Sequence, residues 1–336
     1  MSRLDRRTLL KAGGLALAAP LGAAPLVGAP SIARAQTRAV TVASLFGEDK
    51  PETQVWLRVR ERLATLVPGR FDLRIVQNAA LGGEREVAEG LRLGSVQASL
   101  STVSALSSWV PESQILDLPF VFADAAHVRR ALDGPQGDRL KGLFEAQGFL
   151  VPAFINYGAR HLLAKEPIVR PDQLRGKRIR VIQSPLHTEL WRAFGALPTP
   201  IPIPETYNAL KSGVVDCMDL TKSAYAGFRL HEVVPYLTET AHIWATGVLV
   251  LSAGFWRTLG TEERAAFAAA TREAAPHFDA LMVADEATSM AKVAAEGGKV
   301  VQPADRAAWQ AGAQGVWSSL APRVGGQPRI DALRAA

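Results

Sequence analysis

The chain has 336 residues, of which 48% are hydrophobic and 21% are charged, and its formal net charge is +6. This length is enough for one large or two medium domains with well-formed cores. Five of the basic residues and only one acidic residue lie in the first 35 positions, so the rest of the chain is close to neutral, which excludes the basic footprint of a nucleic-acid-binding protein.

The N-terminal segment has the composition of an export signal. Residues 1–35 combine a positively charged start, an apolar Leu/Ala/Gly stretch and Ala33-Arg34-Ala35, which fits an A-x-A cleavage pattern. Arg6-Arg7 followed by Thr-Leu-Leu-Lys is similar to a twin-arginine signal, with a generic Sec signal as the alternative. We therefore expect residues 1–35 to be removed, and the mature chain to begin near Gln36 in the periplasm.

Apolar runs that suit strands alternate with amphipathic runs that suit helices, a pattern that predicts an α/β protein. In chain order, strands are expected over residues 39–45, 71–77, 96–100, 149–155, 178–182, 214–218 and 299–301. Helices are expected over residues 51–67, 84–93, from 184 onward, 207–211, 261–292 and 303–320. Pro276 predicts a kink or break within residues 261–292, and the tail over residues 325–336 is expected to be loosely held.

One local unit occurs twice along the chain. A helix that ends at a glycine and is followed at once by a strand is found at residues 91–96 and again at residues 210–215. The strands before these junctions, residues 73–76 and 179–182, also alternate Arg with apolar residues. We interpret this repetition as two lobes of similar α/β design rather than one continuous sheet.

Motifs for catalysis or metal binding are lacking. His231-Glu232-Val-Val-Pro235 begins like the zinc motif HExxH but has proline at the second ligand position. No GxSxG, P-loop or GxGxxG pattern is found, and the histidines do not have metal-ligand spacing. The single cysteine, Cys217, excludes an intramolecular disulfide and reads as a buried, inert thiol. The sequence thus predicts neither a metal nor a cofactor, and lowers the odds of an enzyme without excluding one.

Cations at strand ends are the feature that points to a ligand. In the segment GKRIRVIQSP, strand alternation places Arg178 and Arg180 on the same face, with Arg180 nearer the C-terminal end. Ser184-Pro185 then suits a helix start, and ligands of open α/β sheets bind at such strand ends. A guanidinium there can hold a carboxylate through two parallel hydrogen bonds. We expect Arg180 to be such an anchor and Arg178 to be a solvated rim charge.

A second arginine follows a hydrophobic strand and a glycine. On the bare residues, Arg160 in Asn-Tyr-Gly-Ala-Arg160-His reads as a surface loop residue.

Long stretches of the chain resemble one known family. Residues 171–225, followed by residues 231–242, look like the solute-binding proteins of tripartite ATP-independent periplasmic (TRAP) transporters. Supporting segments lie at residues 80–97, 115–122, 156–168 and 248–267, so the resemblance covers essentially the whole mature chain in order.

The resemblance implies a two-lobed periplasmic binding protein fold of type II-like design. A cleft lies between the lobes, which are joined by crossing hinge strands and by a long helix that spans both. We expect lobe I to comprise residues 36–157 and 246–285, and lobe II residues 158–245 and 286–336.

The resemblance also implies the ligand contacts. Arg180 matches the arginine that binds a carboxylate in two-point fashion, Arg160 matches the family's second arginine, and Gln183 matches a polar residue three positions after the first. Leu220 stands where many members have an asparagine that orients the ligand, and Ile203 where some have an aromatic residue. These departures favour a monocarboxylate with an apolar or aromatic body, with Asp219, Thr221 or Tyr225 as possible contacts at its far end. The candidate ligand-binding residues are Arg180, Arg160, Gln183, Asp219, Thr102, Ile203 and Tyr225.

The expected function is capture of an organic acid in the periplasm and its delivery to TRAP membrane permease subunits, with no nucleic-acid partner. Two alternatives stay open. One is a periplasmic enzyme acting on a small carboxylate, with Asp219 or His161 as general base. The other is a ligand receptor that reports to a sensor kinase.

Overall fold

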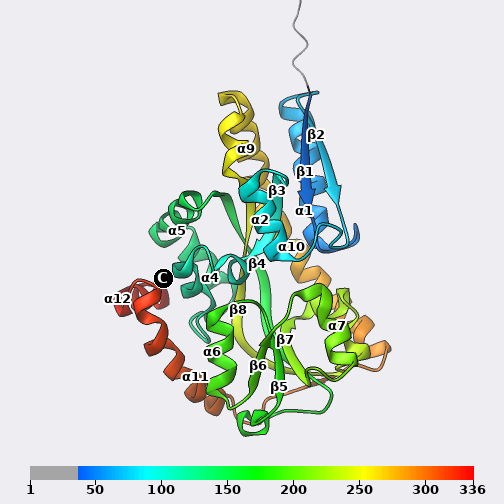
Figure 1. Cartoon of the computed structure of the whole chain (residues 1–336), viewed down its shortest axis with the longest axis vertical. Coiled ribbons are helices and arrows are strands. Elements are labelled where there is room, and N and C mark those ends of the chain that lie inside the picture. Colours follow the sequence, from blue (N-terminus) through cyan, green and yellow to red (C-terminus); the bar gives the residue numbers. More distant parts are fainter. Residues whose placement is uncertain (1–36) are drawn as a thin grey trace, which may run out of the picture. The chain divides into compact units, whose positions relative to one another are not determined.

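The computed structural model describes residues 37–336 (Figure 1). The signal peptide expected over residues 1–35 lies outside these residues. Within residues 37–336, none of the helices has both the length and the apolar composition that a bilayer crossing requires.

The described residues form an α/β fold with nine strands in one hydrogen-bonded sheet. The strands are β1 (Arg38–Ala43), β2 (Phe71–Val76), β3 (Ala98–Thr102), β4 (Phe149–Ala164), β5 (Arg178–Val181), β6 (Leu197–Pro200), β7 (Cys217–Thr221), β8 (Tyr236–Ser252) and β9 (Lys299–Val301). The α-helices are α1 (Pro51–Leu66), α2 (Glu84–Leu93), α3 (Val103–Leu106), α4 (Ala125–Leu132), α5 (Pro135–Ala146), α6 (Pro185–Ala193), α7 (Ile203–Lys211), α8 (Lys222–Gly227), α9 (Ala253–Thr258), α10 (Thr261–Ala295), α11 (Arg306–Leu320) and α12 (Gln327–Arg334). Short 3-10 turns are η1 (Pro111–Asp117), η2 (Pro171–Leu174), η3 (Leu230–Glu232) and η4 (Ala321–Arg323).

The sheet order, β2-β1-β3-β8-β4-β7-β5-β6, divides the fold into two lobes. Lobe I is built on the parallel strands β1, β2 and β3, and lobe II on the parallel strands β5, β6 and β7. Between them lie β4 and β8, which pair with each other in antiparallel fashion along most of their length (Figure 1). The expected two lobes are therefore confirmed, but the expected lack of a continuous sheet is wrong. The two long strands β4 and β8 continue the hydrogen bonding of the sheet from one lobe into the other.

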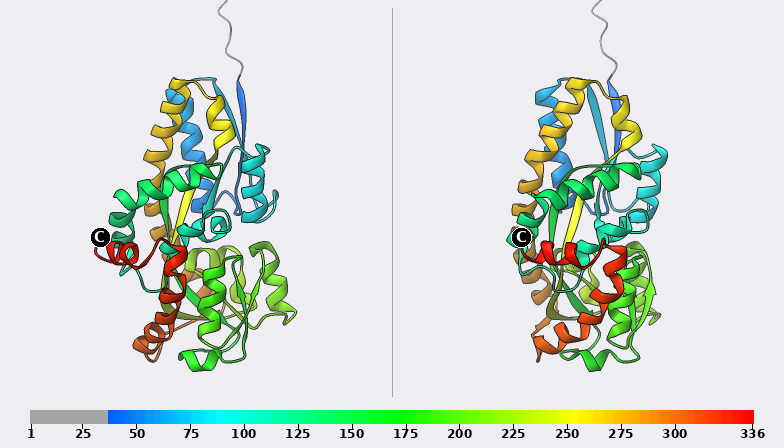
Figure 2. Two further views of the ribbon diagram at one scale, coloured as in Figure 1. Left: turned by 60° about the vertical axis from the view of Figure 1, so that its left-hand side comes forward. Right: turned by 90° about the vertical axis from the view of Figure 1, so that its left-hand side faces the viewer.

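Helix α10 also connects the lobes. It packs against α1 in lobe I, against β4, and against α8 in lobe II, and it runs along both lobes in Figure 2. The break expected at Pro276 is absent, since α10 continues as one helix from Thr261 to Ala295. Proline removes one hydrogen-bond donor, but the surrounding face of the helix is buried through Ala274, Ala275 and Phe278, and this packing holds the helix together.

Local sequence explains most of the other elements. Helix α1 begins with proline at its first position and buries Val55, Trp56, Val59 and Leu63 on one face. Helix α2 spans the residues expected and ends at Gly94, whose left-handed φ of 82° fits a glycine cap. The expected C-terminal looseness is wrong: α12 forms, and its Ile330 and Leu333 are fully buried.

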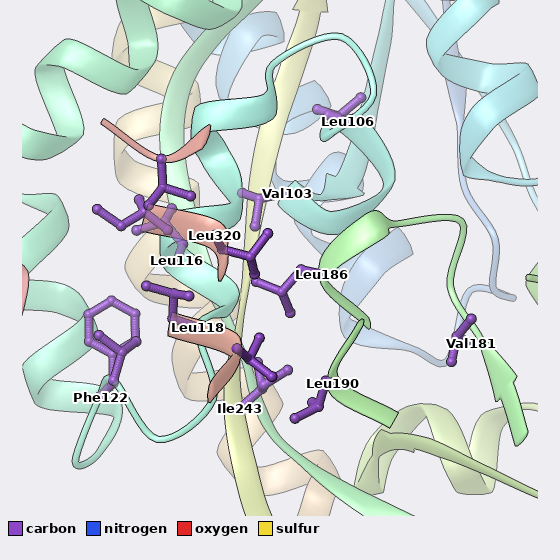
Figure 3. Close-up of a cluster of buried hydrophobic side chains, with 14 of the residues drawn as sticks. Val103, Leu106, Leu116, Leu118, Phe122, Val181, Leu186, Leu190, Ile243 and Leu320 are labelled. Atoms are coloured by element: carbon purple, nitrogen blue, oxygen red, sulfur yellow. The ribbon is translucent and has the colours of Figure 1, made fainter. Parts of the chain in front are cut away.

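A large hydrophobic cluster joins elements of both lobes around β8. It includes Val103 of α3, Leu116 of η1, Leu186 of α6, Ile243 of β8 and Leu320 of α11 (Figure 3). Since α3 and η1 follow β3 of lobe I and α6 follows β5 of lobe II, this cluster packs the two lobes against each other.

Candidate functional site

A cavity of about 50 Å³ lies where the two lobes and the crossing strands meet. Its lining residues are Leu45, Phe46, Glu84, Thr102, Tyr157, Arg160, Arg180, Ile182, Ile203, Leu220, Thr221, Ala224, Phe228 and Ala245. Lobe I contributes the loop after β1, the start of α2 and the end of β3, whereas lobe II contributes the ends of β5 and β7 with α7 and α8. The site therefore lies at the C-terminal ends of parallel strands, as ligand sites of α/β sheets do.

Arg180 is the charged group with the most available hydrogen-bonding capacity in the cavity. It lies on β5 just before the strand ends, and only 2% of its surface is exposed. Its Nε donates to the carbonyl oxygen of Ile201 at 2.8 Å, and neither terminal nitrogen has a hydrogen-bond acceptor among residues 37–336. Burial, followed by the nearby charge of Arg160, lowers the pKa of Arg180 to about 10, so the guanidinium is still charged at neutral pH. A buried cation with two unpartnered donor nitrogens is suited to a bidentate anion.

Arg178 lies outside the cavity. Its side chain is 50% exposed and forms an ion pair with Asp216, with Nη2 and Oδ1 2.6 Å apart. The different positions expected for the two arginines of this strand are confirmed, and Arg178 has a surface partner rather than water alone.

Arg160 lies inside strand β4 and is buried, so its reading as a surface loop residue is wrong. The strand continues through Gly158 because a bulge between Asn156 and Ala159 shifts the register against β8. Gly158 has a φ of +86°, a left-handed conformation that favours glycine, and a Cβ there would also require the carboxylate of Glu286 to shift. Strict alternation would place Tyr157 and Arg160 on opposite faces, but with this bulge between them both line the cavity.

Arg160 is held by Asp219. Its Nε donates to Oδ2 of Asp219 at 2.5 Å, and its Nη2 donates to the backbone oxygen of the same residue at 2.9 Å. Burial of Asp219 opposes its ionisation, but the charge of Arg160 and a hydrogen bond from His242 hold the pKa of Asp219 well below its usual range. Asp219 is absent from the cavity lining, and its carboxylate is a partner for Arg160 in this structure.

Glu84 is a lining residue that the sequence did not single out as part of a site. It is the first residue of α2 and directly follows Gly82-Gly83. An acidic residue at a helix start, after a strand and a glycine pair, is the sequence signal that could have identified it. Its Oε1 accepts from both the backbone nitrogen and the hydroxyl of Thr102, at 2.6 and 2.8 Å. Burial raises the pKa of Glu84, although the hydrogen bonds from Thr102 and the charges of Arg180 and Arg160 counteract this.

Of the other candidate residues, some line the cavity and others lie outside it. Thr102 and Ile203 line the cavity, but the Thr102 hydroxyl donates to Glu84 and accepts from the nitrogen of Ala105. Gln183 lies instead in a separate surface hollow with Ser184 and Thr188. Tyr225 is buried behind the cavity, and its hydroxyl donates to the carbonyl oxygen of Val234 at 2.7 Å. The structure thus brings Arg180, Arg160, Thr102 and Ile203 together and leaves Gln183, Asp219 and Tyr225 outside the lining.

Two residues with potential chemical reactivity lie in settings that disfavour it. His161 is buried beside β8, where burial and the charge of Lys222 lower its pKa to about 3, so it is neutral at physiological pH. The buried thiol expected at Cys217 is confirmed, and burial raises its pKa to about 12.

The sequence and the fold have well-matched relatives. Residues 42–323 match the family model described as bacterial extracellular solute-binding protein, family 7. A solute-binding protein from Verminephrobacter eiseniae is 32% identical over 240 residues, which are 71% of this chain and 72% of that protein.

Solved structures agree with this match. A TRAP periplasmic solute-binding protein from Bradyrhizobium sp. BTAi1, in complex with α/β-D-galacturonate, is 31% identical with a TM-score of 0.84, and the match covers 89% of this chain and 98% of that one. A second, from Polaromonas sp. JS666 and bound to D-erythronate, is 26% identical with a TM-score of 0.86 and coverage of 90% and 99%.

Proposed function

Because the chain belongs to family 7 of the bacterial extracellular solute-binding proteins, the receptors of TRAP transporters, we propose that its cleft captures a small organic acid and delivers it to a TRAP membrane permease. Members of this family are periplasmic transport receptors and not enzymes. His161 and Asp219 both lie outside the cavity lining, and Asp219 is engaged by Arg160, so neither side chain is placed to act as a general base on a ligand in the cavity, which agrees with a binding role.

The observation that carries the proposal is the pair of unpartnered terminal nitrogens on buried Arg180. A carboxylate that accepts from both would supply two charge-assisted hydrogen bonds and compensate the buried charge. Arg160 has one terminal nitrogen, Nη1, without an acceptor among the described residues, and it can donate to the same ligand. The galacturonate and erythronate bound by the two related structures each carry one carboxylate.

Binding and release require the lobes to separate. Arg180 and Arg160 are 2% and 3% exposed, so a ligand cannot reach them in this arrangement. We place the lobe boundaries at 157/158 and 245/246, with residues 36–157 and 246–285 in lobe I, because the register shift at Gly158 gives β4 a point at which it can bend. Small-angle scattering tests this: an acid that binds should reduce the radius of gyration, and an unchanged radius would contradict closure.

A thermal-shift screen followed by calorimetry tests the function itself. D-galacturonate, D-erythronate, succinate and butanoate are the probes, and D-galactose is the matched control that lacks a carboxylate. We expect at least one acid to raise the melting temperature, since a ligand that binds only the folded state stabilises it, and galactose to have no effect. Failure of every acid, or equal binding of galactose and galacturonate, would refute the proposal.

Export through the twin-arginine pathway is part of the same proposal. The support is Arg6-Arg7 and the A-x-A pattern at residues 33–35. Changing Arg6 and Arg7 together to Lys should leave the precursor in the cytoplasm. Continued export of that double variant would indicate the generic Sec route instead.

A further inference from the structure

The apolar part of the cavity lining is one continuous wall. Most of its apolar residues belong to a single hydrophobic cluster, which contains Leu45, Phe46, Ile203, Leu220, Ala224 and Phe228. Leu45 and Phe46 come from the loop after β1 in lobe I, and the others come from lobe II. The wall, named here the apolar wall, is therefore assembled only when the two lobes meet.

Two aromatic rings close the apolar wall across the cleft. The centroids of Phe46 and Phe228 are 4.4 Å apart, with their planes tilted by 40°. Gly227 makes this approach possible, because a Cβ at that position would lie 2.9 Å from a ring carbon of Phe46. Aromatic and aliphatic carbon in this arrangement favours contact with apolar ligand atoms.

The polar groups of the cavity form a second set, separate from the apolar wall and only partly paired among themselves. Thr102 is bound to Glu84, and Arg160 is bound to Asp219. Among the lining side chains of residues 37–336, the polar atoms that make no hydrogen bond are the two terminal nitrogens of Arg180, Nη1 of Arg160, Oε2 of Glu84 and the hydroxyls of Tyr157 and Thr221. Three of these six atoms are guanidinium nitrogens, which suit a carboxylate, and the other three are neutral or anionic groups near it. None of the six belongs to the apolar wall.

We propose, on the basis of the function proposed above, that the ligand is a monocarboxylate with an aliphatic body, whose carboxylate binds Arg180 and whose carbon chain packs on the apolar wall. None of the wall side chains can donate or accept a hydrogen bond. A hydroxyl or a second carboxylate directed at the wall would therefore lose its water without replacement, which weakens binding. The polyhydroxy acids bound by the two relatives lack this apolar body, so the chain differs from them in the class of acid it selects.

Acids with a shared carbon skeleton test this selectivity. Butanoate, D-erythronate and succinate all have a linear four-carbon chain. Butanoate carries no further polar group, D-erythronate carries three hydroxyls, and succinate carries a second carboxylate. Hexanoate and D-galacturonate have six carbons each, but galacturonate forms a ring, so the four-carbon set is the matched comparison. We expect calorimetry to give each apolar acid a dissociation constant at least about tenfold lower than that of its polar counterparts, because one unsatisfied buried polar group accounts for that factor. Tighter or equal binding of erythronate, succinate or galacturonate would overturn the inference and leave the proposed function intact. Binding of none of the acids would overturn both.

A substitution in the wall provides a second test. Leu220→Asn keeps the side-chain size similar but places an amide in the apolar wall, where Leu220 is 8% exposed. The ratio of butanoate to erythronate affinity should shift toward erythronate by about tenfold or more. The matched control is Leu93→Asn at a surface leucine that is 85% exposed, for which the ratio should stay constant. An unchanged ratio in a folded Leu220→Asn protein would overturn the inference, and the acid panel on the parent protein decides it if that variant does not fold.

Discussion

Replacing Arg180 by lysine keeps the positive charge in the cleft but removes the planar pair of terminal nitrogens that can bind a carboxylate. In the parent protein, Nε of Arg180 donates to the carbonyl oxygen of Ile201, and the two terminal nitrogens are free to donate to a ligand. A lysine ammonium is a single point, so it cannot form two parallel bonds to a carboxylate while also bonding to Ile201. The variant therefore loses at least one charge-assisted hydrogen bond to the ligand.

The size of the effect follows from that bond. A hydrogen bond to a charged group contributes about 1.5–3 kcal/mol. At about 1.4 kcal/mol per tenfold change, the dissociation constant should rise by about 10- to 150-fold. The Coulomb attraction of the retained cation sets the upper limit, since the ligand still meets a positive charge.

Isothermal titration calorimetry with the tightest acid of the screen measures the change. Arg178→Lys, two residues earlier on the same strand, is the matched control, because Arg178 is half exposed and paired with Asp216 outside the cavity. We expect the control to keep the parent affinity. An Arg180→Lys protein that binds within about threefold of the parent, a difference too small for the loss of a charged hydrogen bond, would refute the role assigned to Arg180.

Two further predictions concern buried charges. Asp219→Asn should lower the free energy of unfolding by about 3–5 kcal/mol in denaturant titrations, because it leaves Arg160 buried without its anion. The control is Asp216→Asn in the more exposed pair with Arg178, which should change the free energy of unfolding little. Equal effects of the two substitutions would contradict this prediction. Glu52 is buried, burial raises its pKa from 4.5 to about 8, and neither carboxylate oxygen has a partner among residues 37–336. Since the unfolded chain loses this proton from about pH 4.5 while the folded state keeps it to about pH 8, the parent loses stability as pH rises across this window, in total on the order of 5 kcal/mol. The melting temperature of Glu52→Gln should therefore rise relative to that of the parent between pH 5 and pH 8. A difference in melting temperature that stays constant over this range would argue against the raised pKa of Glu52.

The sequence predicted Arg180 because its signals are local. A strand of alternating residues, a helix start at Ser184-Pro185 and an arginine at the strand end lie within ten residues, and the structure places that arginine in a cavity lined by both lobes. Among residues 37–336, the expected segments overlap seven of the nine strands and six of the twelve α-helices, whereas β6 and the long crossing strand β8 were not expected.

Features that depend on distant contacts were not predictable in this way. Arg160 reads as a loop residue because Gly158 looks like a strand end, whereas pairing with β8 carries β4 through the bulge. Helix α12 looks like a loose tail, but Leu333 is buried and its carbonyl oxygen lies 3.0 Å from Nε2 of His127 on α4. Phe46 and Phe228 belong to irregular segments without periodicity, so only the folded chain shows that they meet.

A crystal structure of the mature chain with bound acid tests the central claim most directly. The account predicts one carboxylate whose two oxygens lie about 2.7–2.9 Å from Nη1 and Nη2 of Arg180. A carboxylate bound elsewhere, for example in the hollow beside Gln183, with no anion on the terminal nitrogens of Arg180, would contradict it.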